Sequence, residues 1–207
     1  MKRSLTGDEI VSMRFVQPIS NSPEVQYKLN QILHNSIEDD TLVDVAIVKQ
    51  EGWVAVPIDS NSHITAMNEE DLQRVFLANG YSDLSAVSLD PMGEHPFVLT
   101  FPTTVEGIEE FNREFGHFNF ALFAGVPDWI IIRTVNDFDV VMGSADFVRQ
   151  LLGCDIEEAF ARFQTFATNF PASLQLIREQ LQLVHNHLQN DYPTAEIGSE
   201  FHLTNPI

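Results

Sequence analysis

Residues 118–142 read FNFALFAGVPDWIIIRTVNDFDVVM, and this stretch decides the fold class. It contains three short runs rich in β-branched and aromatic residues, at 118–123, 129–134 and 138–142. Two turn-forming segments separate these runs, Gly-Val-Pro-Asp at 125–128 and Val-Asn-Asp at 135–137. Runs of this composition and length, bounded by turn residues, predict three consecutive strands of a β-sheet.

Helices are predicted on both sides of these strands. Thr103 with Glu106 forms a capping-box signature for a helix before them. Ser144 is placed to cap a helix after them, which Gly153 ends. Two further helices are expected to begin near Asp155 and Pro171, and they make up a C-terminal helical segment.

The upstream half of the chain predicts a similar mixture of elements. We expect an edge strand at 10–16, a helix at 23–37, strands at 42–48, 53–58 and 63–67, a helix capped by Asn68, and strands at 84–89 and 97–101. The predicted fold class is therefore α+β, with a mixed or antiparallel sheet, helices packed on one face and a C-terminal helical segment. No linker-like run divides the chain, so we expect residues 1–207 to form a single compact unit.

An internal repeat is one interpretation of this order. A helix–strand–strand–strand–helix series occurs at 23–79 and again at 104–152, and gapped alignment pairs Trp53 with Trp129. A duplicated module would place two similar halves around a shared cleft, whereas unrelated α+β segments often show the same series. On the duplicated interpretation, the compact unit divides into a first module at 10–90, a second module at 96–152, C-terminal helices at 153–190 and an irregular tail at 191–207.

The expected element order also resembles that of a known group of proteins. From Pro23 to Phe115 it is α-β-β-β-α-β-β-α, which is similar to the small acidic chaperones of type III secretion. The likeness covers about half of the chain and concerns element order, with no shared motif. The extra strands and the C-terminal helices depart from that pattern.

Charge limits the classes of partner. The 207 residues include 30 Asp and Glu but 11 Lys and Arg, which gives a formal net charge of −19. Residues 51–150 hold 16 acidic and 4 basic residues, so their net charge is −12. Direct nucleic-acid binders and proteins that adhere to anionic membranes present clusters of Lys and Arg, so we expect neither class. The acidity favours another protein, and a basic one, as the partner.

Motifs of common enzymes are missing from the sequence. There is no phosphate-binding Gly-rich loop with Lys, no nucleophile elbow and no zinc-protease helix motif. The single cysteine, Cys154, excludes an internal disulfide and stands beside Asp155, whose charge opposes thiolate formation. His185 and His187 would point about 200° apart on a helix, so we expect solvent-facing histidines and not a metal site. The sequence thus predicts no catalytic, cofactor-binding or metal-binding residues, and an enzyme is the less favoured class.

Five residues stand out as candidates for an interaction or pocket site. Trp53 and Trp129 would line an apolar pocket or lie in the core. Arg133 follows three isoleucines in a predicted strand, where a charge should be paired or at a sheet edge. Arg74 and Arg149 each follow an aspartate by three residues, which predicts local ion pairs with anion binding as the alternative.

These observations favour a non-enzymatic, acidic protein-interaction protein, either chaperone-like or a regulator or inhibitor. One alternative is a nucleic-acid mimic that inhibits a DNA-binding protein. Another is an enzyme or small-molecule binder with a pocket between the two modules. We expect a cytoplasmic protein without cofactors, and a homodimer is the other assembly considered.

Overall fold

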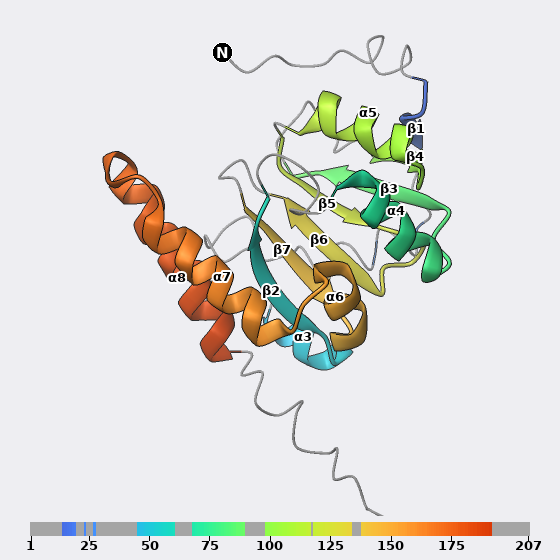
Figure 1. Ribbon diagram of the computed structural model, residues 1–207. Helices are drawn as coiled ribbons and strands as arrows, with labels where there is room; N and C mark the ends of the chain where they lie inside the picture. The colour runs from blue at the N-terminus through green and yellow to red at the C-terminus, as the bar shows by residue number, and fades with distance from the viewer. Residues whose placement is uncertain are drawn as a thin grey trace, which may run out of the picture.

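The computed structural model describes residues 14–19, 23, 27, 45–60, 68–89, 98–116, 118–133 and 138–191. Within them, seven strands form one sheet in the order β1-β4-β3-β5-β6-β7-β2, and all six pairings are antiparallel (Figure 1). The strands are β1 Gln17–Ile19, β2 Val54–Asp59, β3 Asp83–Ser88, β4 Val98–Pro102, β5 Phe120–Phe123, β6 Trp129–Arg133 and β7 Phe138–Gly143.

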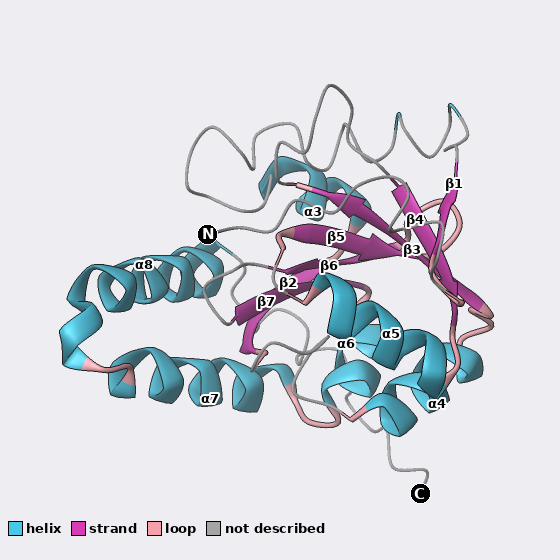
Figure 2. Ribbon diagram, turned by 90° about the horizontal axis from the view of Figure 1, so that it is seen from above, coloured by secondary structure: helices cyan, strands magenta, loops and turns pink. Residues whose placement is uncertain are grey.

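Helices cover the sheet and one of its edges. They are α3 Val45–Glu51, α4 Glu69–Ala78, α5 Val105–Phe115, α6 Ala145–Leu152, α7 Ile156–Asn169, the 3-10 turn Ala172–Leu174 and α8 Gln175–Asp191. Figure 2 shows α4, α5 and α6 together on one side of the sheet and α3 on the other. Helices α7 and α8 pack against each other and both contact the edge strand β2. The α+β prediction, with its C-terminal helical segment, is confirmed.

Aromatic side chains join the helices to the sheet. Trp129 of β6 stacks on Phe76 of α4 and on Phe147 of α6, with both ring centroids 5.1 Å away. Toward the β4 side of the sheet, Phe111 of α5 stacks on Phe101 at 4.4 Å. All five residues of β6 are buried, because the strand lies inside the sheet with residues packed on both of its faces. These aromatic contacts hold α4, α5 and α6 on the sheet.

Helix caps follow the sequence signals with one displacement. Asn68 Oδ1 accepts a hydrogen bond from the Asp71 N–H at 2.9 Å, and Ser144 Oγ accepts one from the Phe147 N–H at 3.2 Å. The cap of α5 is Thr104, which accepts from the Gly107 N–H at 3.1 Å. The prediction of Thr103 as the cap is wrong by one residue, because β4 continues through Pro102 and the Thr103 side chain is buried.

The strand predicted at 42–48 is wrong over the described part, since Val45–Glu51 is helix α3. Its β-branched residues favour a strand locally, but a helix buries Val48 completely and leaves Lys49 and Gln50 exposed. The first copy of the predicted repeat therefore has a helix where the second copy has β5, so the fold gives the repeat no support. The order shared with the type III secretion chaperones is interrupted at the same place.

The predicted edge strand is also displaced. The strand at this edge is β1, Gln17–Ile19, and Arg14 to Val16 precede it without strand structure. Pro18 lies inside the strand and not after it. An edge strand accommodates proline because its outward side has no neighbour that needs an N–H donor.

Some predicted elements lie outside the described residues. These are the strand at 63–67, the tail beyond residue 191 and most of the helix at 23–37, of which Pro23 and Tyr27 are described and helical.

Candidate interaction site

The two tryptophans, for which the sequence left a pocket and the core open, both belong to the hydrophobic core. Trp53 precedes β2 with 8 % of its surface exposed, and Trp129 begins β6 with 1 % exposed. Strands β2 and β6 flank β7, and the register places Val54 and Trp129 opposite Gly143. Trp53 therefore lies one residue out of step with Trp129, and the two side chains contribute to one continuous core.

Arg133 occupies the end of β6 and is almost fully buried. Its register partner on β7 is Asp139, which is completely buried. Directly opposed residues of an antiparallel pair have their side chains on the same face of the sheet, so Asp139 is the cross-strand neighbour of Arg133. The expectation that the charge of Arg133 is paired stays a prediction.

Arg74 and Arg149 form the predicted ion pairs. Arg74 contacts Asp71, and Arg149 Nη1 lies 3.2 Å from Asp146 Oδ1, both at a spacing of three residues. Arg113 of α5 is also paired, with its Nε 2.8 Å from Glu114 Oε1. Each of the three arginines of α4, α5 and α6 therefore has a carboxylate partner on its own helix.

These three helices form what we call the acidic helical layer. Its helices contain eight acidic residues and three arginines, a net charge of −5. A hydrogen bond of 3.2 Å from Asn112 to Glu69 joins α5 to α4, and one of 3.0 Å from Asn79 to Gln150 joins α4 to α6. The layer is thus a connected surface on which carboxylates outnumber their partners.

Several of these acids stabilise the helices that carry them. Glu69, Glu70 and Asp71 lie in the first turn of α4, and Glu106 lies in the first turn of α5. A negative charge there interacts favourably with the helix dipole. Glu70, Glu106 and the mid-helix Glu109 are exposed and accessible to a partner.

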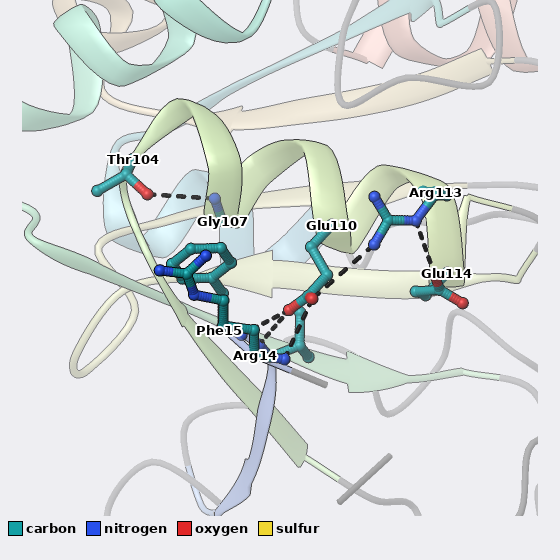
Figure 3. Close-up of polar contacts among 8 residues, drawn as sticks. Arg14, Phe15, Thr104, Gly107, Glu110, Arg113 and Glu114 are labelled. Carbon is teal, nitrogen blue, oxygen red and sulfur yellow. Dashed lines mark hydrogen bonds and ion pairs between the residues drawn. The ribbon is translucent and has the colours of Figure 1, made fainter. Parts of the chain in front are cut away.

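One acid of the layer has a different role, which sequence reasoning missed. Glu110 is buried, and its carboxylate accepts hydrogen bonds from the N–H groups of Arg14 at 3.2 Å, Phe15 at 2.6 Å and Val16 at 2.8 Å (Figure 3). Arg113 Nη2 lies 3.8 Å from it. No local pattern indicates a bond to main chain 94 to 96 residues away, so from the sequence Glu110 is one more acid of the surface.

The carboxylate of Glu110 is held in its ionised form. Burial alone would raise its pKa, but the three N–H donors and the nearby Arg113 outweigh burial and bring the pKa below the usual value. A carboxylate that accepts several main-chain N–H groups is a strong and charge-assisted acceptor.

Two other titratable groups of the described residues, Tyr81 and Cys154, have a raised pKa. Tyr81 Oη donates toward the Asp128 carboxylate, 3.0 Å from both of its oxygens, and burial together with this carboxylate raises the pKa of Tyr81 to about 12. Burial raises the pKa of the Cys154 thiol, which opposes a nucleophilic role. Within the described part of the chain, no three His, Cys, Asp or Glu residues are grouped to hold a metal ion.

The prediction that His185 faces solvent is wrong. The sequence predicts a solvent-facing side chain, but His185 is 1 % exposed and packs on Phe160 and Phe163 of α7, with ring centroids at 5.9 and 6.2 Å. Burial lowers its pKa. The phenylalanine stripe of α7 supplies the packing surface, and His185 takes a core position of α8 beside Leu181 and Leu188.

Comparison with models of protein families, with curated proteins and with solved structures found no match to this chain. Among the described helices, none has the length and apolar character needed to cross a membrane.

Proposed function

We propose that this protein is a non-enzymatic interaction protein that uses the acidic helical layer to bind a basic surface of another protein. The observation that carries the proposal is the state of the arginines in this layer. Arg74, Arg113 and Arg149 are each paired with a carboxylate of the same helix, and these three helices hold a surplus of five carboxylates over arginines. The exposed surplus includes Glu70, Glu106 and Glu109.

Exposed surface charge affects mainly the rate at which a partner associates and which partners are accepted. Complementary surfaces raise the association rate and reject partners of the same sign, whereas the net affinity of exposed ion pairs is small. Salt screens such charges, with a Debye length of about 8 Å at physiological ionic strength. Binding through the layer should therefore weaken strongly as salt is added.

A regulator, an inhibitor or a chaperone-like protein would all use such a surface. A nucleic-acid mimic is a special case in which the basic partner is itself a DNA-binding protein, and competition by duplex DNA distinguishes it. The alternatives of a small-molecule pocket and of a homodimer stay predictions. The single cysteine favours the cytoplasm as the compartment.

Two matched double variants test the proposal. In the layer variant, Glu106→Gln and Glu109→Gln remove one first-turn and one mid-helix carboxylate of α5, both exposed. In the control variant, Glu157→Gln in the first turn of α7 and Glu179→Gln in α8 remove the same charge away from the layer. Wild type and both variants are used to capture partners from native lysate at low and high salt, followed by quantitative mass spectrometry.

We expect a basic partner that wild type and the control variant retain at low salt, that the layer variant recovers several-fold less, and that high salt releases from all three. Equal recovery by the two variants would show that the partner responds to the total charge of the protein and not to the acidic helical layer. The absence of any salt-sensitive partner would contradict the proposal as a whole.

A further inference from the structure

The segment at 14–19 lies on the rest of the protein as a peptide lies in a binding site, with a bend at Arg14 and Phe15 followed by the strand Gln17–Ile19. At one end, the Glu110 carboxylate accepts the three successive N–H groups of Arg14, Phe15 and Val16 (Figure 3). At the other end, Gln17–Ile19 pairs antiparallel with Val98 to Thr100 of β4. Helix α5 and strand β4 together therefore hold one continuous stretch of main chain.

The contacts of this segment include its backbone and the buried side chain of Val16. The contacts to Glu110 come from main-chain N–H groups, which every residue except proline carries. Val16 is completely buried, whereas Arg14 and Gln17 are exposed. Peptides that bind by adding a strand to a sheet edge work in the same way: main-chain hydrogen bonds give affinity, and side-chain pockets give specificity. Another segment with the same bend, an apolar residue at the Val16 position and an extended continuation along β4 would satisfy the same site.

Residues 14–19 pair with the sheet at only three residue positions among those described. Strand β1 has three residues, and Pro18 among them has no N–H donor. In contrast, β3 pairs with β4 over five residues, from Asp83 opposite Pro102 to Val87 opposite Val98. Detachment of 14–19 would leave the β3–β4 pairing intact, so β4 would offer its free edge to another strand.

We propose that Glu110 and the edge of β4 that β1 occupies bind a basic segment of the partner protein, bent where it meets Glu110 and extended along β4, and that residues 14–19 are an internal ligand that this segment displaces. The inference rests on the proposed function, because the acidic helical layer brings the basic partner to α5. Helix α5 carries four glutamates and one arginine, so a positively charged segment is favoured beside it. The internal segment itself has Arg14 at its start.

The test supplies the internal ligand in trans. A labelled peptide of residues 12–20, SMRFVQPIS, is titrated by fluorescence anisotropy into the full-length wild type and into full-length Val16→Asp, whose own segment has lost its anchor. A tethered ligand competes at an effective concentration of about millimolar, so we expect the peptide to bind Val16→Asp at least about tenfold more tightly than wild type. Adding Glu110→Gln to Val16→Asp should weaken the peptide about tenfold, while adding Glu157→Gln should leave its affinity unchanged.

A scrambled peptide of the same composition separates this inference from the proposed function. If both peptides bind equally and salt releases both, the acidic helical layer attracts charge but the site does not recognise the sequence of the segment. The inference then fails, while the proposed function stands. No saturable binding of the native peptide to folded Val16→Asp also overturns the inference. A wild-type dimer that Val16→Asp abolishes would identify a second copy as the occupant and likewise contradict it.

Hydrogen exchange on wild type keeps the test decisive if Val16→Asp does not fold. The amides of residues 14–17 and 19 should exchange by local opening, well before those of β3 and β5. Exchange of both groups only through global unfolding would show that 14–19 is a permanent part of the core and would refute displacement.

Discussion

Replacement of Glu110 by glutamine is the perturbation that most directly tests how the N-terminal segment is held. The substitution keeps the size of the side chain and changes one acceptor oxygen into an NH2 donor. In the wild type, Oε2 accepts from Phe15 and Val16 and Oε1 accepts from Arg14. The glutamine oxygen can serve the first two donors, but its NH2 group then faces the third.

The magnitude follows from these three bonds. A hydrogen bond to a charged group contributes about 1.5–3 kcal/mol, and the substitution removes the charge from all three and the acceptor from one. Because the substituted side chain keeps two weaker bonds, we expect the free energy of unfolding to fall by about 2 kcal/mol. On the displacement proposed above, the loss has a ceiling, because the segment detaches before the sheet unfolds. Local opening of 14–19 should therefore respond more than global unfolding.

Urea denaturation measures the global change, and hydrogen exchange of the amides at 14–16 measures the local one. The control is Glu109→Gln, an exposed neighbour with the same change of charge, for which we expect a difference within about 0.5 kcal/mol. Both variants should keep their secondary structure by circular dichroism, because the bonds of α5 itself are unchanged.

The pH dependence has a definite sign. The pKa of Glu110 is lowered in the folded protein from an ordinary value of 4.5, so its stabilising contribution is fully present above pH 4.5 and is lost as the pH falls through the folded-state pKa. The difference between wild type and Glu110→Gln should therefore shrink below pH 4.5. Equal stability of Glu110→Gln and Glu109→Gln at neutral pH, with unchanged exchange at 14–16, would refute the reasoning.

Three further predictions concern the core. Gly107→Ala should lower the free energy of unfolding by about 1–3 kcal/mol in urea denaturation, because a Cβ at this position would lie 2.4 Å from the backbone oxygen of Pro102. Trp129→Ala should cost about 3–5 kcal/mol by the same assay, since the indole stacks on Phe76 and on Phe147 and is 1 % exposed; a loss under about 1 kcal/mol would contradict its core position. The lowered pKa of His185 means that its contribution to stability is complete above its ordinary value of 6.5 and declines as the pH falls through that value toward the folded-state pKa. In thermal melts between about pH 7.5 and 5.5, wild type should lose stability and His185→Phe should lose less, and parallel losses would show that other groups dominate.

The centre of the sheet was predictable because its local and global preferences agree. β-branched and aromatic runs favour strands, and the runs at 118–142 are buried in the core as well. Caps such as Asn68 and Ser144 were predictable because the donor lies three residues away. In these cases the interaction partners are close in sequence.

The features that the sequence did not predict depend on residues far away in the chain. Helix α3 forms from residues that favour a strand locally, and its Val48 is buried in a core made by residues distant in sequence. His185 looks like a surface residue until α7 packs against it. The role of Glu110 depends on residues about 95 positions away, a separation that neither periodicity nor spacing can reveal.

The net charge of −19 therefore combines carboxylates that do physically different work. Glu110 is an internal acceptor for main chain, Asp71 and Asp146 neutralise arginines, and Glu106 and Glu109 remain exposed to a partner. Substitutions that each remove one negative charge should consequently separate in their effects. Glu110→Gln should change stability and the docking of 14–16 most, whereas Glu109→Gln should change the salt-dependent association and leave stability nearly unaltered. A surface that acted through net charge alone would give the two variants the same binding phenotype, because each changes that charge by one.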